Sequence, residues 1–193
     1  YKRQVEERLQ AAGRRFVPVN LDNFFLDLKD HPRDSRGDYD FETPQALDLA
    51  LINDTLGRLL AGRRVELPYY DFKTGRREGS SGELELKKGE ILLIDSLHGL
   101  HPEMTGNIPE EQRFKLYIET LAQVKDRRRQ FLRWADIRLL RRMVRDMQFR
   151  NYSPRQTILH WHYVRRSELR YIVPRLREAD ALVNSFLAFE LPI

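Results

Sequence analysis

The chain has 193 residues, 41% hydrophobic and 33% charged, with a formal net charge of +5 at pH 7 and a mean hydropathy of −0.62. This balance is typical of one compact domain with its own core and excludes a disordered chain, and no apolar run reaches the roughly 18 residues that a membrane span needs. Because the sequence has no cysteine, disulfides and thiolate metal sites are excluded. No basic-then-apolar leader is present, so we expect a cytoplasmic protein without a membrane partner.

Helical and strand patterns alternate along the chain. Residues 2–12, followed by Gly13, predict a helix that a glycine terminates. Short apolar runs predict strands at residues 16–21, 91–95, 115–119 and 181–184. Further helices are predicted at residues 44–60, about 136–150, and 154–171, the last with Ser153 as its N-cap. This alternation predicts an α/β layered fold with a mainly parallel sheet.

Residues 65–86 interrupt the alternation with two strand-like runs around a turn rich in glycine, serine and arginine. This pattern predicts a β-hairpin flap. There is no internal repeat and no change of composition that would mark a second domain, so we expect residues 1–193 to form a single domain.

Two carboxylates follow predicted strands. Asp22 comes directly after the first strand, and Asp95 ends a second strand shortly before His98. In open parallel sheets, ligands bind beyond the carboxyl ends of the strands, where a general base beside a Mg²⁺ ligand would suit phosphoryl transfer. The alternative is that each carboxylate only stabilises a turn or caps a helix.

The positive charge is concentrated near the predicted helix at residues 136–150. Residues 125–150 contain ten Lys or Arg against three Asp. Within them, Arg138, Arg141, Arg142 and Arg145 follow the i, i+3, i+4, i+7 spacing of one helix face, opposite Ile137, Leu140, Val144 and Met147. Such a face is either simply solvated or binds phosphates, as in a lid over a nucleotide or an RNA-binding helix.

Five motifs together resemble the uridine kinase and phosphoribulokinase-like family of P-loop kinases. They occur in the order that the family shows: LDNFF (21–25), DYDFETPQALD (38–48), YDFKTGRR (70–77), DSLHGL (95–100) and DIRLLRRMVRD (136–146). The resemblance implies a P-loop NTPase-like three-layer α/β/α fold with a β-hairpin flap and an Arg-rich helical lid. It implies transfer of the γ-phosphoryl group of ATP to the 5′-hydroxyl of a uridine- or cytidine-like nucleoside, in pyrimidine salvage.

The resemblance also implies roles for individual residues. Asp22 matches the general base. The substrate-binding positions are Phe25, Phe41, Glu42, Tyr70, Phe72, Arg77 and Arg138. The phosphate lid matches Arg141, Arg142 and Arg145, and Asp95 stands where a carboxylate helps to hold Mg²⁺.

The chain departs from the family pattern in four respects. Gly75 stands where pyrimidine-reading kinases have a histidine, which puts uridine in doubt as the substrate. Asp95 followed by Ser96 replaces the usual Glu-Gly, and the stretch 121–135, with the arginine run 127–129, is longer than usual. No GxxxxGK[ST] phosphate loop occurs.

From this last departure we expect a phosphate loop upstream of Tyr1, with a pseudokinase as the alternative. These traits resemble a bacterial subgroup in which the kinase domain follows a synthetase-like N-terminal region. A homo-oligomer is compatible with the sequence. Alternative functions are a kinase for another small hydroxylated substrate or a sugar phosphate, and a non-catalytic module that binds nucleotides or RNA; a nucleic-acid partner is expected only in this last case.

Overall fold

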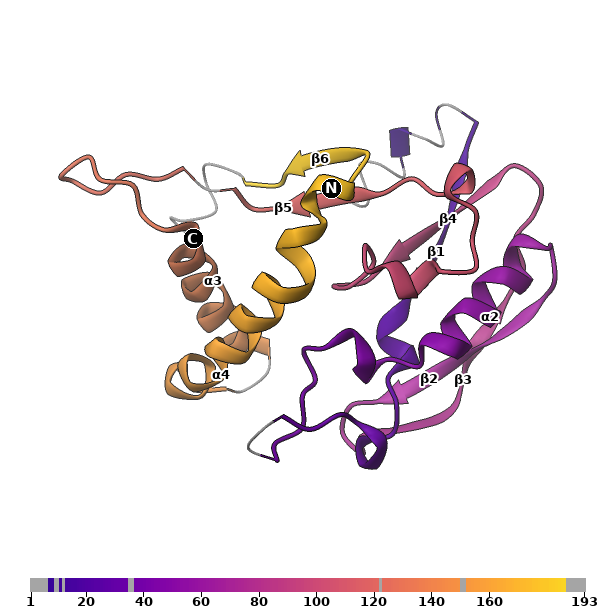
Figure 1. Ribbon diagram of the computed structural model, residues 1–193, viewed down its shortest axis with the longest axis horizontal. Helices are drawn as coiled ribbons and strands as arrows, with labels where there is room; N and C mark the ends of the chain where they lie inside the picture. The colour runs from indigo at the N-terminus through magenta and orange to yellow at the C-terminus, as the bar shows by residue number, and fades with distance from the viewer. Residues whose placement is uncertain are drawn as a thin grey trace. The chain divides into compact units, whose positions relative to one another are not determined.

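A computed structural model describes residues 7, 8, 11, 13–34, 37–121, 123–149 and 152–186. The chain divides into two compact units, residues 1–114 and residues 115–193, and each contains one parallel pair of strands (Figure 1). Among the described residues, no helix combines the length and the apolar composition needed to cross a bilayer.

The predicted first helix falls largely outside the described residues. Of residues 2–12, only Glu7, Arg8 and Ala11 are described, and these three are helical. Gly13, with φ of +70°, has the left-handed conformation that glycine commonly adopts after a helix.

The first unit contains the parallel pair β1 (Arg15–Asn20) and β4 (Glu90–Asp95). Arg15 lies opposite Glu90 at one end of the pair, and Asn20 lies opposite Asp95 at the other. The predictions at residues 16–21 and 91–95 are therefore confirmed to within one residue at each end.

Helix α2 (Leu49–Leu60) begins five residues after the predicted start at Pro44. The residues before it form a 3-10 turn (Pro44–Ala46), and Leu47 is extended and forms a bridge with Phe25. Asp48 is the true N-cap because its carboxylate accepts the N–H of Leu51 at 3.0 Å.

The predicted hairpin is formed by β2 (Val65–Asp71) and β3 (Arg76–Leu84), which pair antiparallel. The register shifts on either side of Pro68, which has no N–H to donate to the ladder. Helix α2 packs alongside this hairpin, and the core between them includes the fully buried Ile52, Leu56 and Leu59.

Short 3-10 helices complete the first unit. The segment η1 (Leu21–Phe24) follows β1 directly and buries Leu21 and Phe24 in the core. The others are η2 (Leu28–Asp30), η4 (Pro102–Thr105) and η5 (Glu110–Gln112).

The second unit contains the parallel pair β5 (Leu116–Glu119) and β6 (Ala181–Asn184), with helices α3 (Trp134–Phe149) and α4 (Pro154–Ser167). A capping box of Ser153 and Gln156 starts α4 at the predicted residue. The helix ends four residues before the predicted Tyr171, and continues as a π-helical turn (Glu168–Ile172) and a 3-10 helix (Val173–Glu178).

Candidate active site

Two carboxylates lie at the same edge of the β1–β4 pair. Since Asn20 pairs with Asp95 in a parallel ladder, the carboxyl ends of both strands meet there. Asp22 follows two residues later in η1, where its N–H donates to the side-chain oxygen of Asn20 at 3.0 Å. Both Asp22 and Asp95 are exposed, so neither carboxylate belongs to the core.

The 3-10 turn explains why Asp22 faces outward. Leu21 and Phe24, three residues apart, are 0% and 1% exposed and fix one side of η1 in the core. Because a 3-10 helix repeats every three residues, Asp22 lies off this buried side. The sequence therefore places an acid beyond the end of a buried strand with its carboxylate accessible to solvent.

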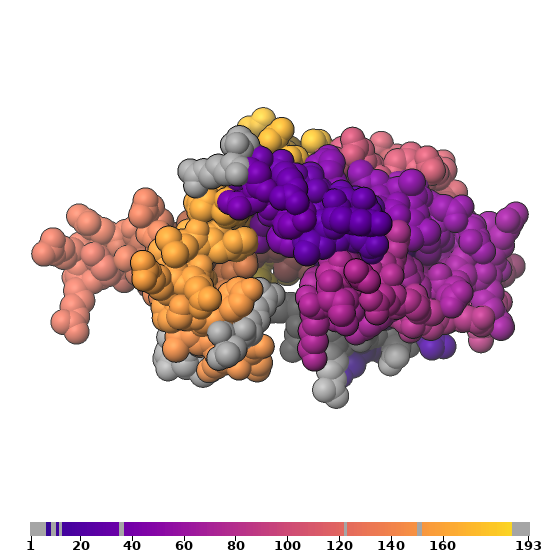
Figure 2. Space-filling view, turned by 90° about the horizontal axis from the view of Figure 1, so that it is seen from below, coloured from indigo at the N-terminus to yellow at the C-terminus, as the bar shows by residue number. Residues whose placement is uncertain are grey.

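An aromatic cluster begins three residues after Asp22. The ring of Phe25 lies 5.5 Å from that of Tyr70 and 5.8 Å from that of Phe72, and the last two rings are 5.0 Å apart. On the other side, His31 stacks on Phe25 at 5.7 Å and lies 4.9 Å from Phe41. In the space-filling view, the indigo part of this unit, which supplies the early residues of the cluster, lies directly against the magenta part that contains the hairpin (Figure 2).

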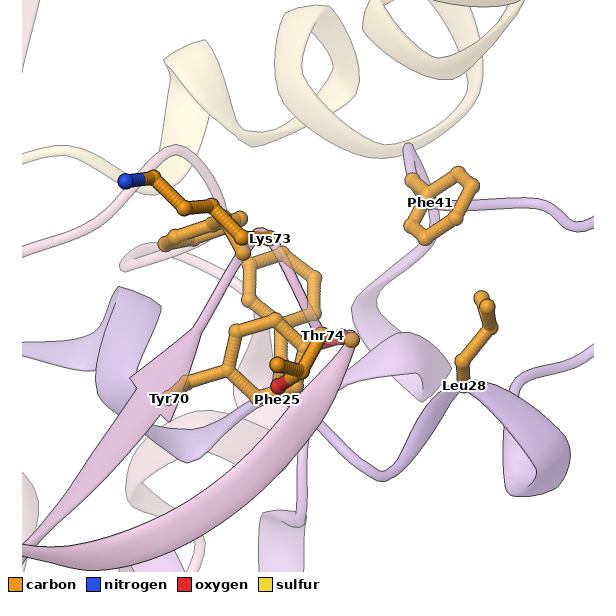
Figure 3. Close-up of a pocket in the computed structure, with 8 residues that line it drawn as sticks. Phe25, Leu28, Phe41, Tyr70, Lys73 and Thr74 are labelled. Carbon is orange, nitrogen blue, oxygen red and sulfur yellow. The ribbon is translucent and has the colours of Figure 1, made fainter.

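These rings enclose a hollow of about 140 Å³. Figure 3 shows Leu28 and Phe41 on one side of it and Phe25 and Tyr70 facing them. The lining residues are Phe25, Leu28, Phe41, Tyr70, Phe72, Lys73, Thr74 and Gly75. The hollow thus brings together four of the substrate-binding residues that the sequence predicts, while Asp22, Glu42 and Arg77 do not line it.

The hairpin is tied to the segment that follows η1. Arg77 donates its guanidinium N–H to the Asp48 carboxylate at 2.9 Å, and its backbone N–H donates to Asp27 at 2.9 Å. The backbone N–H of Tyr70 approaches the side-chain oxygen of Asn23 at 3.5 Å. Arg77, expected to contact substrate, therefore holds the hairpin in place through Asp48.

Two buried histidines adjoin Phe41 and Glu42, which are predicted substrate-binding residues. His98, 5% exposed, lies near Glu42, and its burial lowers its pKa to about 4, although the nearby carboxylate opposes the shift. Burial also lowers the pKa of His31, whose Nε2 lies 2.8 Å from the carbonyl oxygen of Leu26. In both cases burial favours the neutral imidazole.

The arginine face of α3 contacts carboxylates of its own unit. Arg138 forms ion pairs with Glu119, at 3.6 Å, and with Glu168, which is 2% exposed. Arg142 pairs at 3.3 Å with Asp146, which is 1% exposed. Burial lowers the pKa of Arg138, with Glu119 opposing the change. Buried carboxylates need such partners, so these two arginines have a structural role in this unit.

The remaining residues of this helix differ in exposure. Arg141 is half-buried and Arg145 is exposed. On the apolar side of α3, only Ile137 is buried, whereas Leu140, Val144 and Met147 are 57%, 49% and 55% exposed.

No group of three or more His, Asp or Glu side chains within the described ranges could hold a metal ion by itself. Asp95 is nevertheless a suitable Mg²⁺ ligand, because it is an exposed carboxylate at the carboxyl end of a strand. Mg²⁺ is commonly held by one or two protein carboxylates together with substrate phosphates.

Two residues at or beside the hollow were not predicted from the sequence. His31 lies outside every predicted helix and strand, yet it is 4% exposed and its ring contacts those of Phe25 and Phe41. Leu28 lines the hollow beside Gly75. Neither lies in a periodic pattern, so only the folded contacts reveal them.

Comparison with known proteins identifies the family. Residues 3–190 match the Phosphoribulokinase / Uridine kinase family. The chain belongs to this family. A uridine kinase from Deinococcus deserti is 27% identical over 177 residues, which cover 91% of this chain and 77% of the relative. A uridine-cytidine kinase B from Dictyostelium discoideum is 25% identical over 182 residues, which cover 93% of this chain and 66% of the relative.

Solved structures of kinases show the same fold at low sequence identity. A proposed fructose transport system kinase from Silicibacter aligns with a TM-score of 0.60 and 16% identity, covering 94% of this chain and 81% of that chain. A proposed uridine kinase from Bacillus stearothermophilus aligns with a TM-score of 0.57 and 13% identity, covering 93% and 78%. These findings confirm the predicted P-loop kinase family and three-layer α/β fold, and this family member is a phosphotransferase with an alcohol group as acceptor.

Proposed function

We propose that the protein transfers the γ-phosphoryl group of ATP to the 5′-hydroxyl of a uridine- or cytidine-like nucleoside, with Asp22 as the general base. The observation that carries the proposal is the position of Asp22, exposed at the carboxyl end of β1 and three residues before Phe25 of the aromatic hollow. The uridine kinases among its relatives support a nucleoside as the acceptor. We infer a cytoplasmic enzyme of pyrimidine salvage.

The proposed chemistry needs one proton acceptor. Asp22 takes the proton of the 5′-hydroxyl while that oxygen forms a bond to the γ-phosphorus of ATP. The bond between this phosphorus and the bridging oxygen then breaks, and ADP leaves. A positioned base of this kind contributes about 10²- to 10⁴-fold to the rate.

The aromatic side chains hold the nucleoside in this proposal. Phe25, Tyr70 and Phe72 pack against the flat base, and Phe41 and the adjacent Glu42 contact the ribose. Aromatic rings at these separations provide apolar surface and stacking faces, which suit a flat heterocycle.

Asp95 would be the protein's ligand for Mg²⁺, and the metal would neutralise charge on the phosphates of ATP. We assign Arg141, Arg142 and Arg145 to the phosphate lid on the strength of the family resemblance and the charge of α3. Of these, Arg142 also pairs with Asp146 in its own helix. The proposal assigns no phosphate loop, because GxxxxGK[ST] does not occur in the sequence.

A panel of acceptors tests the proposal. The full-length protein should form ADP from ATP and Mg²⁺ only when a ribonucleoside is present, and ³¹P NMR should locate the product phosphate on the 5′-oxygen. If ADP formed with a sugar phosphate as the acceptor but with none of the ribonucleosides, the protein would be a kinase of the alternative acceptor class. Binding of RNA that weakens steeply with salt and is unchanged in Asp22→Asn, without any ADP formation, would favour the non-catalytic alternative.

A further inference from the structure

Leu28 and Gly75, the latter in the turn of the hairpin, form an apolar wall on one side of the hollow. Gly75 lies in this wall with φ of +67°, a left-handed conformation. A Cβ at this position would lie 3.1 Å from the Cβ of Leu28 and 3.4 Å from its Cδ2. A larger residue would have to displace Leu28 and adopt a backbone that costs roughly 1–2 kcal/mol for an L-residue. The local structure therefore selects glycine at the position where the kinases that this chain resembles have a histidine.

Backbone hydrogen bonds fix this wall. The N–H of Leu28 donates to the carbonyl of Gly75 at 2.8 Å, and the N–H of Gly75 donates to the carbonyl of Asp71 at 2.8 Å. The neighbouring Asp27 carboxylate accepts the backbone N–H of Arg77 at 2.9 Å. Leu28 thus presents hydrocarbon from a fixed backbone beside Gly75 in the lining of the hollow.

The polar side chains that line the hollow are one lysine and two hydroxyl groups. Lys73 is exposed, and its ammonium group points away from Leu28 and Phe41 (Figure 3). The remaining polar groups are the hydroxyls of Tyr70 and Thr74, and the latter lies 3.4 Å from the carbonyl oxygen of Asp71. A hydroxyl can donate or accept a hydrogen bond, so it fits a keto group and an amino group equally.

We propose that the site binds the base through the shape of the base and the stacking of its faces. It makes no selective hydrogen bond to the exocyclic group on the base edge that meets Leu28 and Gly75. The substrate class is then ribonucleosides with a flat heteroaromatic base, including pyrimidin-2-one riboside, which has hydrogen in place of that exocyclic group. This inference rests on the proposed nucleoside kinase function. A site that hydrogen-bonds a substrate group rejects the analogue lacking it by about 10⁴- to 10⁵-fold, whereas an apolar wall leaves no buried partner unpaired when the group is absent.

Calorimetric binding and kcat/KM should be measured for uridine, cytidine and pyrimidin-2-one riboside with the full-length protein. We expect the three values to agree within about fivefold, a difference of about 1 kcal/mol. A larger loss for pyrimidin-2-one riboside, or a larger gap between uridine and cytidine, would overturn this inference while leaving the nucleoside kinase proposal intact. Failure to bind or phosphorylate any ribonucleoside would overturn both.

A matched pair of variants tests the wall directly. Leu28→Ala should open space at the base edge and improve binding of 4-methylthio-pyrimidin-2-one riboside relative to uridine by about tenfold, as expected for one or two methylene-sized contacts. Leu84→Ala is the control, because Leu84 is a half-buried leucine of the same hairpin that does not line the hollow. Leu28→Val is a milder variant that should show a smaller gain in the same direction if Leu28→Ala does not fold. An equal response in the Leu28 and Leu84 variants would contradict the assignment.

Discussion

The ion pair between Arg77 and Asp48 is predicted to hold the hairpin against the rest of its unit. Arg77→Met removes the guanidinium but keeps an unbranched apolar side chain and the backbone N–H that donates to Asp27. Asp48→Asn removes the charge but keeps an oxygen that can cap α2, where the N–H of Leu51 lies 3.0 Å away. Each substitution therefore isolates the ion pair.

The geometry sets the magnitude. The two groups are 2.9 Å apart and their side chains are 29% and 22% exposed. Fully exposed pairs contribute about 0–1 kcal/mol, and hydrogen bonds to charged groups contribute about 1.5–3 kcal/mol. For this half-buried pair, we expect Arg77→Met to lower the free energy of unfolding by about 1.5 kcal/mol. Nucleoside affinity should fall by about three- to tenfold because the hairpin carries Tyr70 and Phe72.

Urea unfolding followed by circular dichroism, together with calorimetric titration of uridine, measures both effects. Arg76→Met is the matched control, since Arg76 is the neighbouring exposed arginine of the same strand. A double-mutant cycle of Arg77→Met and Asp48→Asn should give a coupling energy of about 1 kcal/mol. If Arg77→Met and Arg76→Met behaved alike in stability and affinity, the anchoring role would be refuted.

Three further predictions concern other charged groups. At pH 7, His98 is mostly neutral in both folded and unfolded chains, whereas at pH 5 mainly the unfolded chain gains a proton, because the folded pKa is lowered to about 4. His98 should therefore contribute a fall of about 2 kcal/mol in the unfolding free energy from pH 7 to pH 5, and His98→Gln, unlike the exposed His162→Gln, should remove this contribution. Arg138→Ala should lower the stability of the second unit by about 1.5 kcal/mol, because it removes one of the two arginines, Arg138 and Arg165, that pair with the buried Glu168. The fluorescence of the two tryptophans, both in residues 115–193, would report this loss, and an unchanged midpoint would contradict it. Arg141→Ala should reduce ATP-dependent turnover more than nucleoside binding, and the opposite pattern would count against a phosphate lid.

The strands were predictable because their signals are local. The apolar runs before Asp95 and Asn184 form strands that end at these two residues. The turn around Gly75 joins the two hairpin strands. The motif order also led to Phe25, Tyr70 and their neighbours, which the structure brings together around one hollow.

The errors occurred where distant contacts override local signals. Pro44 suggested a helix start, but Leu47 bridges to Phe25 and is 5% exposed, so the helix begins only after the Asp48 cap. Helix α4 ends earlier than predicted because the chain changes to a π-helical turn at Glu168. The carboxylate of this residue is buried against arginines of its own unit. The ion pairs of Arg77 and Arg138 could not be read from the sequence either, because the carboxylates of Asp48 and Glu168 lie 29 and 30 residues away along the chain.

The most direct test of the account is the turnover of Asp22→Asn with ATP, Mg²⁺ and uridine. Asparagine preserves the size of the side chain but cannot accept the proton, so kcat should fall at least about 10²-fold while circular dichroism and uridine affinity change little. Asp30→Asn is the control because Asp30 is an exposed aspartate of η2, and this variant should keep its turnover. Full turnover in a folded Asp22→Asn protein would contradict the central claim that this carboxylate is the general base.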